Sequence, residues 1–255
     1  MNSNSIDINC DMGESYGRFK VGNDEALFPW ISSCNIACGF HGGDPWHIEQ
    51  TIKSALKHNL RIGAHPSYPD LAGFGRRAMQ IVPSELKSII KYQIAAVKGL
   101  TESLGGSLTY VKPHGALYNT AAKTETEATV IMEAIREIDD SLLLMGLAGS
   151  PIEQWAKDHK IPFIAEAFAD RQYTPEGRLM SRQLSGALIQ DPLQAAQQVM
   201  DIATNQKVQT ANGSYIPLKA QSICIHGDNP AALEILKQIH ASFASAQWAI
   251  KPHQK

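Results

Sequence analysis

Short, almost uninterrupted apolar runs alternate with longer amphipathic segments along most of the chain. Runs of this kind predict the strands of a parallel sheet whose outer side is covered by helices. We expect seven such strands, at Ile6–Cys10, Cys34–Phe40, Arg61–His65, Leu108–Lys112, Leu142–Leu147, Phe163–Phe168 and Ser222–His226. The pattern therefore predicts an α/β fold built from β/α units.

Helix starts are marked by a capping residue directly before a proline. The cap accepts hydrogen bonds from free backbone N–H groups, and proline at the first helical position has no N–H to leave unpaired. Four such pairs occur, at Asp44-Pro45, Ser150-Pro151, Asp191-Pro192 and Asn229-Pro230. A longer amphipathic helix is predicted from Pro83 to Leu104, ended by Gly105 and Gly106.

Two stretches interrupt this alternation, Pro66–Met79 and Ala169–Ser185. Long loops inside a compact domain are more often functional than idle. A third segment, Val208–Leu218, has Asn212-Gly213 at its centre and is predicted to form a peripheral β-hairpin.

The length and charge of the chain indicate how many domains it forms and which classes of protein can be excluded. We expect 255 residues to form a single β/α-barrel domain spanning residues 1–255, because barrels of this size are often one domain. A net charge of −2 provides no basic surface for nucleic acid, and no apolar stretch is long enough to span a bilayer. The polar start of the chain lacks the layout of a signal peptide, which predicts a cytoplasmic protein. The four cysteines form no Cys-x-x-Cys pair and are predicted to pack as small apolar residues.

Four of the predicted strands end at, or one or two residues before, a histidine that is followed by glycine or proline. The carboxyl ends of barrel strands open onto one face, so these imidazoles are expected to meet there. A single histidine at a strand end is more often structural, but four at equivalent places favour a catalytic or ligand-binding site. The four are His41, His65, His114 and His226.

Carboxylates recur at alternate positions along two other predicted strands, the first and the sixth. Asp7, Asn9 and Asp11 share one face of the first strand, and Glu166 and Asp170 lie on one side of the sixth. A buried polar network of purely structural purpose is the alternative. Carboxylates held close to imidazoles shift one another's pKa values, which separates acid and base roles near neutral pH.

Cations complete the predicted rim. Lys112 precedes His114, and the two long loops carry Arg76, Arg77 and Arg171, whose guanidinium groups suit carboxylate or phosphate. The chain has no Walker-type loop, no Gly-x-Gly-x-x-Gly after a strand and no Gly-x-Ser-x-Gly elbow. These residues therefore predict a hydrolytic or acid–base site for a small anionic molecule, and do not name it.

Seven sequence blocks spread over residues 7 to 228 resemble the family of lactam-utilisation proteins, understood as the A subunit of bacterial 5-oxoprolinase. These blocks are DINCDMGE (7–14), NIACGFHGGD (35–44), GAHPSYPD (63–70), GFGR (73–76), KPHGALYN (112–119), EAFADR (166–171) and HGD (226–228). The resemblance implies a distorted seven-stranded β/α barrel similar to glycoside hydrolases and carbohydrate deacetylases. It also implies ATP-dependent hydrolysis of 5-oxo-L-proline to L-glutamate together with subunits B and C.

The same resemblance implies a division of labour. ATP is consumed by the complex and bound by the partner subunits, which activate the lactam, so that ring opening by water falls to this chain. We expect catalytic roles for Asp11, His41, His65, His114 and Glu166, without assigning which is acid and which is base. We expect substrate binding by Asp7, Asn9, Arg76, Lys112, Asp170, Arg171 and His226.

Two other functions stay open at this point. Asp11, His41, His65 and His114 offer ligand types for zinc or another divalent ion, which would suit a metal-dependent deacetylase or amidohydrolase acting alone. The spacing carries no compact metal signature, so whether a metal is bound stays undecided. The second alternative is a non-catalytic subunit that only presents substrate to its partners, against which the density of ionisable groups argues.

Overall fold

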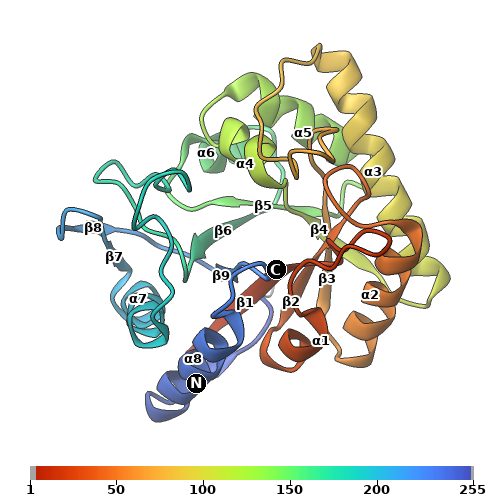
Figure 1. Cartoon of the computed structure of the whole chain (residues 1–255). Helices are drawn as coiled ribbons and strands as arrows, with labels where there is room; N and C mark the ends of the chain where they lie inside the picture. Colours follow the sequence, from red (N-terminus) through yellow and green to blue (C-terminus); the bar gives the residue numbers. More distant parts are fainter. Residues whose placement is uncertain (1–3, 254–255) are drawn as a thin grey trace.

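A computed structural model of the chain describes residues 4–253 and shows a closed parallel barrel surrounded by helices (Figure 1). Six consecutive strands pair side by side, and the last barrel strand, β9, pairs with both β6 and β1 and so closes the ring. The seven barrel strands are β1 (Ser5–Met12), β2 (Ser33–Ala37), β3 (Arg61–His65), β4 (Leu108–Val111), β5 (Leu143–Leu147), β6 (Phe163–Phe168) and β9 (Ser222–Ile225).

Helices follow most of the barrel strands and cover the outside of the sheet (Figure 1). They are α1 (Asp24–Leu27) with a 3-10 turn (Phe28–Trp30), α2 (Pro45–Lys57), α3 (Pro83–Ser103), α4 (Gly115–Ala121), α5 (Glu125–Ile138), α6 (Pro151–Asp158), α7 (Pro192–Asn205) and α8 (Ala232–Ser245). None of these helices in residues 4–253 combines the length and apolar character needed to cross a membrane.

All seven predicted strands form, and the predicted barrel is confirmed. The second strand is shorter than expected, because the chain leaves the sheet after Ala37 and turns at Gly39, whose φ is +88°. A two-residue strand, β10 (Ala249–Ile250), pairs with Ser5 and Ile6 at the start of β1 and was not expected. It is too short to produce a readable apolar run.

The proline-marked helix starts are confirmed in three cases. Asp44 caps α2 by accepting hydrogen bonds from Trp46 and His47, and Asp191 caps α7 by accepting one from Gln194. Helix α6 begins at Pro151 as expected, although the Ser150 hydroxyl donates to the Leu147 carbonyl instead of capping. The prediction at Asn229-Pro230 was wrong by two residues: Asn229 accepts a hydrogen bond from the N–H of Ala231 in a turn, and α8 begins only at Ala232.

The two long loops and the hairpin are also where the pattern placed them. Residues 66–82 and 169–191 contain no helix and no named strand. The hairpin consists of β7 (Lys207–Gln209) paired antiparallel with β8 (Tyr215–Pro217). The loops lie after β3 and β6, at the carboxyl end of the barrel, and therefore can reach over its mouth.

Most apolar side chains pack between the sheet and its helices, in one cluster that extends from Ile6 to Phe243. A small second cluster consists of Tyr110, Leu143, Met145 and Ile164. The four cysteines are buried and free, and burial raises the pKa of each thiol, which agrees with a packing role. The expectation of one domain over residues 1–255 stays a prediction.

The inner face of β1 is polar, as its alternation predicted. Asp7 and Asn9 are fully buried and Asp11 is 7% exposed. Asn9 and Asp11 bond to side chains of β6 and of the residue after β4, strands that are not sheet neighbours of β1, so they cross the barrel interior. The barrel interior thus contains a polar network that leads up to its mouth.

Candidate active site

Lys112, the first residue after β4, lies at the centre of the polar groups inside the barrel. Its ammonium nitrogen is 2.9 Å from Oδ1 of Asp11 and 2.8 Å from Oε1 of Glu166. It also lies 3.2 Å from Oδ1 of Asn9 and 3.1 Å from Sγ of Cys224. We call these five residues, Asn9, Asp11, Lys112, Glu166 and Cys224, the lysine network.

Side chains from neighbouring strands hold the lysine network in place. The amide nitrogen of Asn35 donates to Asn9 at 2.7 Å and to Asp11 at 2.8 Å, and the Tyr110 hydroxyl donates to Asn35 at 2.6 Å. Tyr110 fits only because its neighbour on β3 is Gly63: a Cβ there would lie 2.2 Å from the tyrosine ring. Shape and hydrogen bonding therefore fix the network together.

In the lysine network, the effect of neighbouring charges on the pKa of Asp11 and Lys112 opposes the effect of burial. Burial alone would raise the pKa of Asp11, but the charges of His65 and Lys112 outweigh it and hold that pKa well below its usual range. Burial alone would lower the pKa of Lys112, but the carboxylates around it raise that pKa well above its usual range. At neutral pH the network contains a carboxylate and an ammonium ion in direct contact.

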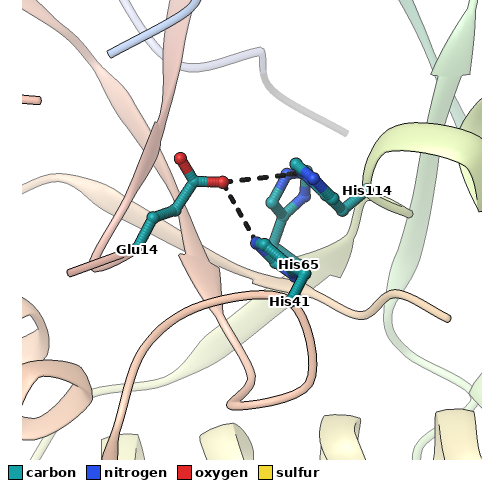
Figure 2. Close-up of side chains that lie close together, drawn as sticks. All are labelled: Glu14, His41, His65 and His114. Carbon is teal, nitrogen blue, oxygen red and sulfur yellow. Dashed lines mark hydrogen bonds and ion pairs between the residues drawn. The ribbon is translucent and has the colours of Figure 1, made fainter. Parts of the chain in front are cut away.

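A second group, which we call the histidine cluster, lies beside the lysine network and consists of Glu14, His41, His65 and His114 (Figure 2). All four side chains are buried. Oε1 of Glu14 is 3.0 Å from Nε2 of His41 and 3.6 Å from Nδ1 of His114. Nε2 of His65 lies 3.3 Å from Oδ2 of Asp11, which joins the cluster to the lysine network.

The rings of the histidine cluster pack tightly. His41 and His114 are stacked with centroids 3.7 Å apart, and His65 meets His114 edge-on at 4.8 Å. Gly75, in the loop after β3, touches this pair: a Cβ at Gly75 would lie 2.7 Å from His114 and 2.8 Å from His41. Its φ of +64° also suits glycine. Burial lowers the pKa of both His41 and His114, so both rings are neutral at pH 7.

A cavity of about 510 Å³ opens above the two groups, and Asp11, His65, Lys112 and His114 contribute to its lining. Its outer wall carries Arg76, Arg171 and Arg182 from the two long loops. This volume suits a small molecule. Asp228 holds two of the arginines, with Oδ2 at 2.5 Å from Arg76 and 3.4 Å from Arg182.

His226, directly after β9, also lines this cavity. Its Nδ1 is 2.8 Å from Oδ1 of Asp170, and Asn229 donates to the other carboxylate oxygen at 3.1 Å. Burial alone would raise the pKa of Asp170, but His226 and Asn229 outweigh it and lower that pKa. The ring stacks on Phe168 with centroids 5.3 Å apart, so its orientation is set on two sides.

The structure brings most of the sequence-predicted site residues to this one place. Seven of them line the cavity: Asp11, His65, Arg76, Lys112, His114, Arg171 and His226. Four others touch lining residues from behind: Asn9, His41, Glu166 and Asp170. Their individual roles stay predictions.

Asp7 and Arg77 lie apart from the cavity lining. The Asp7 carboxylate is fully buried and accepts hydrogen bonds from the hydroxyl groups of Ser32, Ser33 and Ser222. Arg77 pairs with Asp70, and its side chain is 67% exposed. For both residues the geometry gives no direct route to a molecule in the cavity.

Sequence reasoning missed several residues of the site. Glu14 belongs to the histidine cluster, Asn35 and Cys224 contact Asp11 and Lys112, and Asp228 holds arginines of the outer wall. Asn35 could have been found from the sequence. It lies two residues after Ser33 on β2, so these two polar side chains share one face of the strand, as Asn9 and Asp11 do on β1. No such signal existed for Glu14, because it follows β1 in a loop whose path is set by tertiary contacts.

The described residues include two groups that could hold a metal ion. One is the histidine cluster, and the other is Asp11, Cys224 and His226; within each group the ligand atoms lie within 4.8 Å of one another. In the second group, however, the ammonium of Lys112 already contacts both Asp11 and Cys224. That group therefore already contains a cation, whereas the histidine cluster contains no lysine or arginine.

Fold and site define a β/α-barrel protein with ionisable side chains gathered at the carboxyl ends of its strands. A sequence profile of the LamB/YcsF family matches residues 6–255, and the chain belongs to this family. It is 47% identical to the A subunit of 5-oxoprolinase from Photorhabdus laumondii, over 95% of this chain and 96% of that protein.

Solved structures agree with the family assignment and with the predicted fold. The lactam utilization protein of Thermus thermophilus superposes with a TM-score of 0.91 at 37% identity, covering 97% of this chain and 99% of that one. A family 4 carbohydrate esterase from Streptomyces lividans gives a TM-score of 0.52 at 10% identity, covering 97% and 91% of the two chains. The second likeness concerns the fold alone and confirms its deacetylase-like architecture.

Proposed function

We propose that this chain is the ring-opening component of an ATP-dependent 5-oxoprolinase, which hydrolyses 5-oxo-L-proline to L-glutamate together with subunits B and C. The names of its relatives support this proposal. The absence of a recognised nucleotide-binding loop in the sequence agrees with ATP being bound by the partner subunits. A cytoplasmic location stays part of the prediction.

The observation that carries the proposal is the contact between Asp11 and Lys112 on the wall of the cavity. Opening a lactam with water requires a base for the water, a positive group near the carbonyl oxygen as it gains negative charge, and a proton for the ring nitrogen. Asp11 and Lys112 are 2.9 Å apart and both face the cavity. They can therefore act on the same reacting carbonyl group.

The geometry favours particular roles for these residues. Asp11 would accept the proton of the attacking water, since its Oδ2 is free of the contacts that hold Oδ1 to Lys112 and Asn35. Lys112 would stabilise the carbonyl oxygen. Glu166 is fully buried and does not line the cavity, so it would hold Lys112 in position and not act as the base.

His226 is our proposed donor of the proton to the ring nitrogen. Asp170 binds Nδ1 of the ring, which leaves Nε2 for the cavity side. A carboxylate behind an imidazole orients the ring and stabilises its charged form. The carbon–nitrogen bond would break as the nitrogen takes this proton, and the new carboxyl and amino groups would both belong to glutamate.

The arginines of the outer wall support an anionic substrate. Arg171 is only 6% exposed, and its Nε has no hydrogen-bond partner among residues 4–253. Burial, followed by the charge of Arg182, lowers the pKa of Arg171 to about 10, so the group remains cationic at neutral pH. An unpaired buried donor next to the cavity fits the carboxylate of 5-oxoproline, or a phosphoryl group on an activated intermediate.

The test is ATP-dependent release of glutamate from 5-oxo-L-proline by this chain mixed with subunits B and C, each component being left out in turn. We expect glutamate only when all three are present. Asp11→Asn should lower the rate by about 100-fold or more, as loss of a general base does. Asp158→Asn, at the exposed end of α6, is the matched control and should leave the rate unchanged.

Other results would replace the proposal. Hydrolysis by this chain alone, without ATP, would favour the independent amidohydrolase. Full activity of the Asp11→Asn and Lys112→Met variants in the complete mixture would favour a protein that only presents the substrate to its partners.

A further inference from the structure

The hydrogen bonds of two histidines determine which of their ring nitrogens are free. Nδ1 of His65 is 2.7 Å from the main-chain carbonyl of Lys112, and Nε2 of His114 is 2.9 Å from that of Phe74. A carbonyl oxygen can only accept, so each of these nitrogens must carry a hydrogen. The lone pair of a neutral ring is then on Nε2 of His65 and on Nδ1 of His114.

These two remaining nitrogens face each other and two carboxylates. They are 2.9 Å apart. The neighbouring oxygens are Oδ2 of Asp11, 3.3 Å from His65, and Oε1 of Glu14, 3.6 Å from His114. When both rings are neutral, all four atoms are acceptors, and a cation bound between them would satisfy all four.

No side chain in the described part of the chain supplies that charge to Glu14. Glu14 is 6% exposed, and its ion-pair partners within residues 4–253 are histidines, with no lysine or arginine among them. A buried carboxylate without a cation is strongly unfavourable. Lys112 is occupied by Asp11 and Glu166 on the other side of the site.

We propose that Glu14, Nε2 of His65 and Nδ1 of His114, whose side chains lie together in Figure 2, bind one divalent metal ion. This ion would lie next to Asp11, which lines the cavity together with His65 and His114. Metal-binding histidines characteristically donate their second N–H to a carbonyl or a carboxylate, as both of these rings do. Two imidazoles and a carboxylate suit Zn²⁺ or a neighbouring first-row ion. When bound, such an ion would polarise a carbonyl group or a water molecule.

His41 would position this site without binding the ion. Its ring is parallel to that of His114 at 3.7 Å, and an imidazole binds a metal in its own plane, so two stacked rings cannot both point at one ion. Nε2 of His41 lies 3.0 Å from Oε1 of Glu14 and can donate to it. His41 therefore orients Glu14, as a residue behind a metal ligand does.

The inference concerns the ion and holds whatever the substrate is, so it is tested on the isolated chain without partners, ATP or 5-oxoproline. Metal-stripped protein is titrated with Zn²⁺ by calorimetry and with Co²⁺ by visible absorption. We expect one ion per chain, with affinity reduced more than about 100-fold in His65→Gln and His114→Gln, and about 10- to 100-fold in His41→Gln. The matched control is His159→Gln, at the end of α6, which should bind as the wild type does.

Circular dichroism of each metal-stripped variant shows whether it folds. Should a histidine variant fail to fold, Glu14→Gln replaces it, because Gln keeps the shape of Glu14 and an acceptor for His41 while removing the charge. The proposal is overturned if the wild type binds neither ion saturably. It is also overturned if the folded His65, His114 and Glu14 variants bind as tightly as His159→Gln, which would place the ion on the surface.

Discussion

The lysine network and the histidine cluster are neighbours with opposite electrostatic balance. In the lysine network one ammonium contacts two carboxylates, and the pKa of Asp11, which burial alone would raise, lies well below its usual range because of the charges beside it. In the histidine cluster one carboxylate faces neutral rings. The first group contains its own cation, whereas the second leaves lone pairs and a negative charge without one.

The residues around Glu14 also carry more negative than positive charge. The carboxylate of Asp24 accepts a hydrogen bond from the N–H of Gly13, the residue before Glu14. Burial, reinforced by the charges of Glu14 and Glu25, raises the pKa of Asp24 to about 6. The comparison shows two ways in which a buried carboxylate can be stabilised. It can pair with a lysine or arginine of the same chain, or, where no such side chain is near, it can depend on a bound cation.

Removing Lys112 should produce the largest effect on stability. Lys112→Met leaves Asp11 and Glu166 buried without their cation, which should lower the free energy of unfolding by about 3–5 kcal/mol and abolish glutamate release. Urea unfolding and the three-subunit assay measure the two effects. Lys157→Met, on the exposed surface of α6, is the control and should change stability by less than about 0.5 kcal/mol.

Glu14→Gln is the counterpart of that change in the histidine cluster. Because Glu14 has no lysine or arginine partner in the described chain, removing its charge should leave the metal-free protein as stable as the wild type or more so. A large loss of stability in Glu14→Gln, or none in Lys112→Met, would show that the two groups do not differ as we describe.

A methyl group at Gly75 tests how closely the histidine cluster is packed. Gly75→Ala should destabilise the fold by about 2–4 kcal/mol, since a Cβ would press on His41 and His114 and the positive φ adds backbone strain. Gly17→Ala is matched in φ, at +56°, but its Cβ would have no neighbour within 4 Å. It should lose only the strain, about 1–2 kcal/mol. Equal thermal unfolding of the two variants would contradict the close packing.

The pH dependence of stability tests the excess negative charge near Glu14. The pKa of Asp24 is raised from 3.8 to about 6, so the stability linked to its protonated form is present below pH 3.8 and is lost as pH rises through 6. Asp24→Asn cannot ionise. It should therefore gain about 1–2 kcal/mol relative to the wild type between pH 4 and pH 7.5, after allowance for partial exposure.

Urea unfolding at the two pH values measures this gain, and Asp158→Asn, the same substitution at the exposed end of α6, is the control. If the free energy of unfolding of Asp24→Asn differed from that of the wild type by the same amount at both pH values, the excess of negative charge near Glu14 would be contradicted. Saturating Zn²⁺ should reduce the difference, because a bound cation would lower the pKa of Asp24.

Freeing the outer arginines should have the smallest effect. Asp228→Asn removes the carboxylate that Arg76 and Arg182 share, and such partly exposed ion pairs contribute less than about 1 kcal/mol. The more positive wall should lower KM for the anionic substrate about 2- to 5-fold at unchanged kcat. Steady-state kinetics of the three-subunit mixture measure this, with Asp158→Asn as control; a raised KM would show that Asp228 acts by orienting the arginines.

Much of the fold could be predicted because its signals are local. Apolar runs identified all seven barrel strands, and a cap followed by proline identified the start of α2, α6 and α7. The failures have local causes as well. Asn229 and Pro230 form a turn before α8 instead of its first residues, and β10 is too short to be recognised.

The sequence by itself determined the β/α barrel and the face on which its site lies. Strands in register deliver their last residues to one end, so histidines and carboxylates at those ends had to converge. The tertiary structure alone decided which of them touch. Lys112 contacts Asp11 and Glu166 across the barrel, and Glu14 contacts His41 and His114 from a loop. Lys112 and Asp11 are 101 residues apart in the sequence. Compensation of buried charge depends on distances of a few ångströms between such residues, and no local pattern encodes those distances.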